Sequence, residues 1–152
     1  MLASVREYFS TDIEALTGLM GDLGYPSSID QMKQRMEAIQ SNTDYFSFVA
    51  CVEDQVVGMI GVRLVHYYEA DGLAAQISAL VARHDYQGKG IGKQLIAYVE
   101  KWALEQGCSS LYLTSGLKPE RMQAHEFYKK LGFQITGYRF VKPLSGSLNS
   151  AK

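Results

Sequence analysis

The sequence has few of the residues that mark stapled, metal-bound or membrane-spanning chains. Only two cysteines and three prolines occur among its 152 residues. Cys51 and Cys108 fit neither a CxxC motif nor a Cys/His metal-ligand spacing, so we expect two reduced thiols in the core and no metal. The longest apolar run covers residues 56–62, far below the ~18 residues that a membrane-spanning helix needs.

We also expect no export signal, and the sequence has no strong excess of charge of one sign. Arg6, Glu7 and Asp12 interrupt any apolar stretch near the N-terminus, so we expect a cytoplasmic protein with no membrane partner. Fifteen basic and sixteen acidic side chains give a net charge of −1, which argues against a general nucleic-acid binder.

The charge is unevenly distributed along the chain. Residues 1–75 carry four basic and eleven acidic side chains, whereas residues 76–152 carry eleven basic and five acidic ones. This asymmetry favours an anionic ligand on the C-terminal half and a cationic one near the N-terminal half. The alternative, that these charges only solvate the surface, stays open.

The length and composition indicate one globular domain with its own hydrophobic core. A chain of this length buries roughly 70% of the surface that its unfolded form exposes. No repeat or linker divides it before a Ser- and Gly-rich end. We therefore expect a single domain over residues 1–144 and a frayed tail over 145–152.

The first third of the chain predicts a strand followed by two helices. The strand is expected over Leu2–Tyr8. Two capping boxes, Thr11–Glu14 and Ser28–Gln31, each precede apolar residues at helical spacing, and the first helix is expected to end at Gly24.

The rest of the chain alternates between strand and helix patterns. Helices are expected from Ile91 to Gly107 and from Pro119 to Gly132. Strands are expected over Phe46–Val52, Val56–His66, Ala74–Ala82, Ser109–Ser115 and Phe133–Val141. The order is β-αα-βββ-α-β-α-β, which indicates an α/β fold with a mixed sheet.

A turn with three alternating glycines joins one predicted strand to the following helix. Gly88, Gly90 and Gly92 leave the backbone free to adopt unusual angles and bring N–H groups to the positive end of the helix. Such a turn suits a phosphate.

Two common phosphate motifs do not fit this turn. The loop GxxxxGK[ST] would need glycine and Ser or Thr where the chain has Gln87 and Gln94. The dinucleotide motif GxGxxG would need glycine where Lys93 or Leu95 stands. What remains is the pattern Gln-x-x-Gly-x-Gly at 87–92.

This pattern resembles the acetyl-CoA loop of the GNAT superfamily of N-acetyltransferases. A second block of that family, Ala-x-x-Phe-Tyr-x-x-x-Gly-Phe, is matched by Ala124, Phe127, Tyr128, Gly132 and Phe133. The order of predicted elements also agrees, so the resemblance covers residues 2–141 and implies the GNAT acyl-CoA N-acyltransferase fold. The segment from Leu113 to His125 is similar to an aminoglycoside-acetyltransferase-like subgroup.

The resemblance implies acetyl-CoA as cosubstrate and no metal. The strand end is expected to pair with the pantetheine arm as an added strand would, and the turn is expected to hold the diphosphate. The residues implied are Leu80, Val81, Ala82, Gln87, Gly88, Lys89, Gly90, Ile91, Gly92 and Lys93.

The resemblance also implies catalytic roles. Tyr128 matches the tyrosine that serves as general acid for the leaving thiolate, although packing beside Phe127 is an alternative role. Many relatives place a glutamate as base where this chain has Gln76. Glu69 is our first candidate for a substitute; Asp71, His66 or a water chain near Tyr67 and Tyr68 are the others.

We therefore expect an N-acetyltransferase that moves the acetyl group to the primary amine of a small cationic acceptor by direct attack. Two alternatives remain. Gln76 would suit a non-catalytic domain that binds or senses acyl-CoA, and an open groove would suit acetylation of a protein lysine or N-terminus. By family habit, a homodimer is also expected.

Overall fold

The computed structural model describes residues 2–145 and divides into two compact units, over residues 1–111 and 112–152. We call them the first and second units and treat each by itself. The predicted single domain over residues 1–144 stays a prediction. The predicted tail lies outside the described residues except for Ser145.

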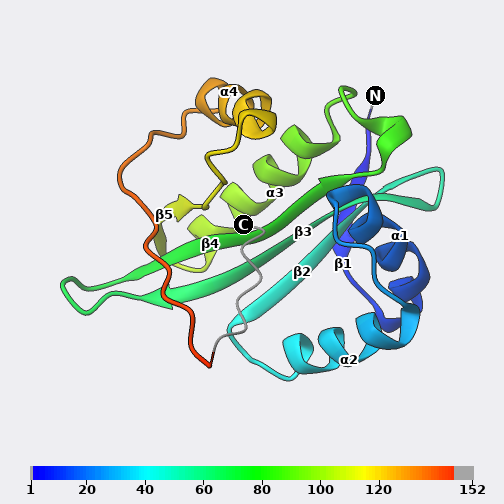
Figure 1. The fold of residues 1–152 in the computed structure, drawn as a ribbon, viewed down its shortest axis with the longest axis horizontal. Helices are drawn as coiled ribbons and strands as arrows, with labels where there is room; N and C mark the ends of the chain where they lie inside the picture. The colour runs from blue at the N-terminus through cyan, green and yellow to red at the C-terminus, as the bar shows by residue number, and fades with distance from the viewer. Residues whose placement is uncertain (1, 146–152) are drawn as a thin grey trace. The chain divides into compact units, whose positions relative to one another are not determined.

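Five strands form one mixed sheet in the order β1-β2-β3-β4-β5 (Figure 1). Neighbours from β1 to β4 run antiparallel. The strands are β1 (Ser4–Glu7), β2 (Tyr45–Val52), β3 (Gln55–His66), β4 (Leu73–Ala82) and β5 (Cys108–Tyr112), and the helices of the first unit are α1 (Ile13–Leu23), α2 (Ile29–Gln40) and α3 (Ile91–Glu105). The expected strand and helix order is thus confirmed up to β5.

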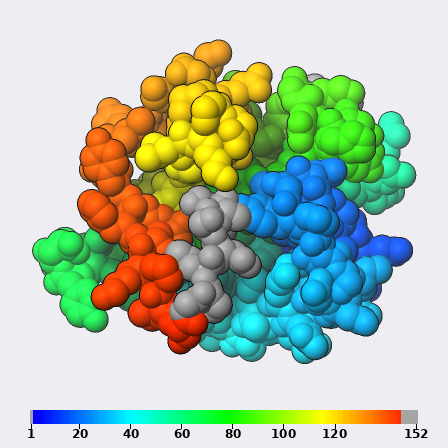
Figure 2. Space-filling view, in the orientation of Figure 1, coloured from blue at the N-terminus to red at the C-terminus, as the bar shows by residue number. Residues whose placement is uncertain are grey.

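Helices α1 and α2 cover one face of the sheet (Figures 1 and 2). Side chains alternate between the two faces of a strand, and those on this face join the buried residues of the two helices. The cluster consists of Tyr8, Leu16, Leu19, Met32, Met36, Val49, Cys51, Met59 and Val81. Helix α1 ends as predicted at Gly24, whose φ of 104° is left-handed.

Helix α3 packs on the opposite face. Phe48 lies one residue from Val49 and therefore points the other way; its ring centre is 5.1 Å from that of Tyr98 and 5.5 Å from that of Trp102. The apolar stripe of α3 is fully buried at Leu95, Ile96 and Val99. Both cysteines are buried and free, as the sequence predicts.

Of the two predicted capping boxes, one is confirmed and one is wrong. The Ser28 hydroxyl accepts from the Gln31 N–H at 3.1 Å, and the Gln31 side chain accepts from the Ser28 N–H at 2.9 Å. Thr11 caps nothing, because a 3₁₀ turn (Ser10–Asp12) precedes α1. There Asp12 accepts from the Phe9 N–H and from both Nη groups of Arg6, which lowers the pKa of Asp12.

The second unit holds a 3₁₀ turn at Pro119–Arg121 and helix α4 (Met122–Lys130), which is followed by the left-handed Gly132. The predicted last strand, Phe133–Val141, is wrong for this structure, since no strand is assigned there. A strand needs a neighbouring backbone for its hydrogen bonds, and this segment leaves Ile135 76% and Phe140 92% exposed. The alternation of apolar residues could not reveal whether a partner exists.

Gly58 on β3 lets α3 lie close to the sheet. A Cβ at this position would be 2.7 Å from Ile91 Cγ2 and 3.1 Å from the Val81 carbonyl oxygen. Because the backbone of β4 cannot retreat easily, we expect Gly58→Ala to lower the free energy of unfolding by about 1–3 kcal/mol.

Urea unfolding followed by circular dichroism measures this effect, and Gly18→Ala is the matched control. Gly18 lies inside α1, and a Cβ added there would meet nothing within 4 Å, so alanine there should raise stability by up to about 1 kcal/mol. Equal stability of the two variants would show that the close approach at Gly58 is unimportant.

Candidate functional site

The glycine-rich turn begins where β4 leaves the sheet. The Arg83 N–H still donates to the Val57 carbonyl at 2.7 Å, and a 3₁₀ turn (His84–Tyr86) follows. Gly88 and Gly90 then adopt left-handed φ values of 76° and 86°, and α3 starts at Ile91. Two of the three alternating glycines of the turn thus occupy conformations that other residues rarely adopt.

The turn exposes the N-terminus of α3. The first N–H groups of a helix, here those of Ile91, Gly92 and Lys93, have no acceptor within the helix. The turn is exposed at Gly88 and Gly90, and a Cβ added at Gly88 would meet nothing within 4 Å. The turn is therefore open to a ligand, and the helix dipole favours an anion there.

Aromatic and charged side chains brace the turn. Arg83 donates to both carboxylate oxygens of Asp85, at 2.7 and 3.1 Å, and this pairing lowers the pKa of Asp85. The Arg83 guanidinium lies 4.9 Å from the ring centre of Tyr86, and Lys89 Nζ lies 5.2 Å from it. Asp85 balances the charge of Arg83, so Lys89 adds net positive charge beside the turn.

Two glutamines fix the ends of the turn. The Gln94 side chain donates to the Gly90 carbonyl at 3.1 Å and accepts from the Ala3 N–H at 2.8 Å. The Gln87 side chain reaches back to the Ala82 carbonyl at 3.4 Å. The turn is thus tied to the N-terminal segment and to the end of β4.

The outer edge of β4 near Ala82 has no strand beside it among the described strands. Ser109 at the start of β5 donates to the Leu73 carbonyl at the start of β4, 3.4 Å away. Because β5 has five residues and β4 has ten, β5 accompanies only the first part of β4 (Figure 1). Apart from the Ala82 carbonyl, which accepts from Gln87, the outer edge of Leu80–Ala82 therefore faces no strand of the first unit and is suited to pair with an extended ligand.

Comparison with known proteins decides the family of this chain. A sequence profile of the Acetyltransferase (GNAT) family matches residues 13–133. The chain belongs to the GNAT acetyltransferase family. It is therefore an N-acetyltransferase, an acyltransferase of the kind that uses acetyl-CoA.

Three proteins illustrate how far the similarity extends. An uncharacterized N-acetyltransferase of Bacillus subtilis, YhdJ, is 33% identical over 83% of this chain and 87% of its own length. An aminoglycoside N(6′)-acetyltransferase of Stenotrophomonas maltophilia is 29% identical over 90% and 91%. A GNAT family acetyltransferase structure from Staphylococcus aureus superposes with a TM-score of 0.81 at 27% identity and covers 95% of this chain and 100% of that one.

Tyr128, the predicted general acid of this GNAT chain, lies on α4 in the second unit. It is half-buried, and its ring centre is 5.4 Å from that of Phe127 and 5.9 Å from that of Phe133. Burial raises the pKa of Tyr128, while Arg121 acts in the opposite direction. The phenol is therefore protonated throughout the neutral pH range.

Glu69, the predicted base, lies in the exposed loop between β3 and β4, which projects at the left of Figure 2. The distal end of this hairpin is remote from the glycine-rich turn. Leu73, where β4 begins, is about 23 Å of strand from Leu80 at 3.3 Å per residue. The structure thus does not bring Glu69 together with the other predicted residues of the first unit.

Gln76 has a partner that the sequence reasoning missed. Arg63 on β3 lies directly opposite Gln76 on β4, and Arg63 Nε donates to Gln76 Oε1 at 2.6 Å. The strand register is the signal that would have found this pair. The register could not be counted from the sequence, because β4 has one extra residue, Ser78, between the pairs Gly61–Ala79 and Val62–Ile77.

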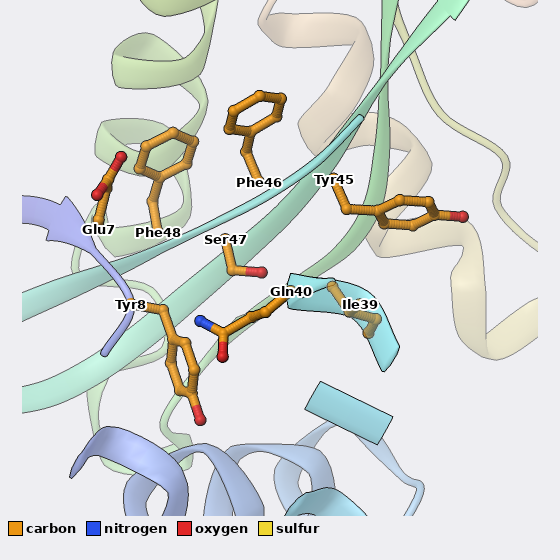
Figure 3. A pocket seen from close by; sticks show the side chains of 8 residues that line it. All are labelled: Glu7, Tyr8, Ile39, Gln40, Tyr45, Phe46, Ser47 and Phe48. Atoms are coloured by element: carbon orange, nitrogen blue, oxygen red, sulfur yellow. The ribbon is translucent and has the colours of Figure 1, made fainter. Parts of the chain in front are cut away.

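A cavity of about 160 Å³ lies at a different place in the first unit, between β1, the end of α2 and the start of β2 (Figure 3). Tyr8, Gln40, Tyr45 and Ser47 are among its lining residues. None of the predicted cofactor-binding or catalytic residues lines it, so the candidate site is not this cavity.

Within residues 2–145 no group of three or more His, Cys, Asp or Glu side chains is placed to hold a metal ion. In the same part of the chain no helix is both long and apolar enough to span a membrane.

Proposed function

We propose that this GNAT chain transfers the acetyl group of acetyl-CoA to the primary amine of a small acceptor, which carries a positive charge at neutral pH. The observation that carries this proposal is the turn after β4, with left-handed Gly88 and Gly90 and an open helix N-terminus. The similarity to an aminoglycoside N(6′)-acetyltransferase supports an amine acceptor.

In this proposal the turn holds the diphosphate of acetyl-CoA. The free N–H groups at Ile91, Gly92 and Lys93 donate to phosphate oxygens, and Lys89 and Lys93 supply positive charge. The excess of basic residues after position 75 points the same way. The open edge of Leu80–Ala82 takes the amide groups of the pantetheine arm.

The amine attacks the thioester carbonyl directly. Its nitrogen forms a bond to the carbonyl carbon, the C–S bond then breaks, and the thiolate takes a proton, for which Tyr128 is the proposed donor. An acyl-enzyme route has little support, because Cys51 and Cys108 are buried and burial raises the pKa of Cys108. A buried thiol with a raised pKa is a poor nucleophile.

The proton lost by the amine goes to water in this proposal. Glu69 is far along the hairpin, and the Gln76 amide is neutral and bonded to Arg63. For an amine with a pKa near ~10, about one molecule in a thousand is neutral at pH 7. The value of kcat/KM for the amine should therefore rise about tenfold per pH unit from pH 7 until most of the amine is neutral.

A thiol-release assay tests the proposal. The purified chain is mixed with acetyl-CoA and a panel of primary amines, secondary amines and alcohols, and free CoA is followed with a thiol reagent. We expect release with primary amines and a mass increase of the acceptor equal to one acetyl group. Release without an acetylated acceptor, or tight binding of acetyl-CoA with no reactive amine, would contradict the proposed transfer.

A further inference from the structure

A polar row crosses the sheet on the face of α1 and α2. Side-chain alternation along β3 puts Arg63 on the same face as Met59, which belongs to the cluster beneath these helices. Tyr45 on β2 and Gln76 on β4 are its direct cross-strand neighbours. All three side chains are half-buried. We call Tyr45, Arg63 and Gln76 the polar row.

The hydrogen bond within this row fixes what it offers to a ligand. A guanidinium donates only, so Gln76 must turn its carbonyl oxygen to Arg63 Nε, as observed at 2.6 Å. Both Nη groups of Arg63 and the Gln76 NH₂ group are left as donors. Among residues 2–145, Arg63 has no acidic partner and no second acceptor.

An unpaired, half-buried guanidinium on a sheet face differs from an exposed basic side chain on a helix. Its donors are partly withdrawn from water, so an anion that binds two of them gains charge-assisted hydrogen bonds at little desolvation cost. A polycation would instead be repelled there. The neutral Gln76 does not offset this charge.

We propose that Arg63 binds an anionic group of the acceptor, so that the preferred acceptor is a zwitterion with a primary amine and a carboxylate, phosphate or phosphonate. This rests on the proposed function, which lays the donor along the outer part of β4. Leu80 is four residues from Gln76, about 13 Å along the strand. A donor arm extending from the glycine-rich turn past Leu80 therefore points its thioester towards the polar row.

Pairs of amines that differ only in the anionic group test this inference. Phosphoethanolamine is compared with ethanolamine, β-alanine with 3-amino-1-propanol, and spermidine serves as polycation. We expect kcat/KM to be about 10- to 100-fold higher for the anionic member of one pair, mostly because its KM is lower. Preference for the phosphate pair or for the carboxylate pair identifies the group.

Arg63→Gln should remove that preference and leave the affinity for acetyl-CoA unchanged. Arg63→Glu should make spermidine the preferred acceptor, and Arg63→Lys should keep part of the preference for the anionic amine. The exposed Arg35, which donates to Ser27 on the surface, supplies the control variant Arg35→Gln. If Arg63→Gln does not fold, competitive inhibition of the wild type by methylphosphonate or acetate against the acceptor replaces it.

The inference is overturned if the wild type prefers spermidine, if the anionic group makes no difference, or if Arg63→Gln slows all amines equally. Those outcomes leave the proposed function standing, because amines are still acetylated. Failure to bind acetyl-CoA or to acetylate any amine would instead refute the proposed function.

Discussion

Replacing Tyr128 by phenylalanine is expected to lower kcat about 100-fold or more and to leave the affinity for acetyl-CoA nearly unchanged. The ring and its contacts with Phe127 and Phe133 would remain, so only the hydroxyl is lost. The pKa of the phenol is raised and lies above the ~8.5 of a thiol, so Tyr128 holds its proton and is available as a hydrogen-bond donor while the C–S bond breaks. In the proposed mechanism Tyr128 donates this hydrogen bond to the leaving sulfur as general acid.

Steady-state kinetics and calorimetric titration separate these quantities. Tyr138→Phe, which removes the hydroxyl of an exposed tyrosine in the same unit, is the matched control and should behave as wild type. A parallel loss of turnover and acetyl-CoA affinity in Tyr128→Phe would assign Tyr128 to packing.

Replacing Gly90 by valine is expected to weaken the binding of acetyl-CoA at least about 100-fold. Gly90 has a φ of 86° directly before α3, and a β-branched residue avoids this region at a cost of about 1–2 kcal/mol. The chain would relieve the strain by rotating the peptides around position 90. The N–H groups that we propose to bind the diphosphate would then point elsewhere.

Gly107→Val is the matched control for this variant. Gly107 follows the other end of the same helix with a φ of 88°, and a Cβ added there would meet nothing within 4 Å. Both variants should lose similar stability in thermal unfolding, while Gly107→Val should keep its affinity for acetyl-CoA. If both variants bound acetyl-CoA equally well, the turn geometry at Gly90 would have no role in binding.

Local signals in the sequence were sufficient to predict most helices and strands of the first unit. The Ser28–Gln31 capping box and the terminating glycine Gly24 act within a few residues, so their geometry follows from the residues themselves. The turn between β2 and β3 was predicted one residue too long, because Gln55 already pairs with Val52 in the sheet. Glu53 and Asp54 take left-handed φ values of 50° and 66° there, as a two-residue hairpin turn requires.

Features that depend on distant partners could not be predicted in this way. The segment Phe133–Val141 has the alternation of a strand but is not one in this structure. The residue directly before helix α1 is Asp12 and not the predicted Thr11. Arg6, six residues earlier, donates two hydrogen bonds to the Asp12 carboxylate. The position of Glu69 and the pairing of Arg63 with Gln76 follow from the register of the β3–β4 hairpin, which an irregularity near Ser78 shifts.

We propose that the turn at Gln87–Lys93 holds the diphosphate of acetyl-CoA while the acetyl group is transferred to an amine. Calorimetric titration of the unmodified chain with acetyl-CoA and with S-acetylpantetheine, which lacks the diphosphate, tests it most directly. We predict one acetyl-CoA bound per chain, at least about 100-fold tighter than S-acetylpantetheine, with an affinity that falls as salt rises. Equal affinity for the two thioesters, or no binding of acetyl-CoA, would contradict the account.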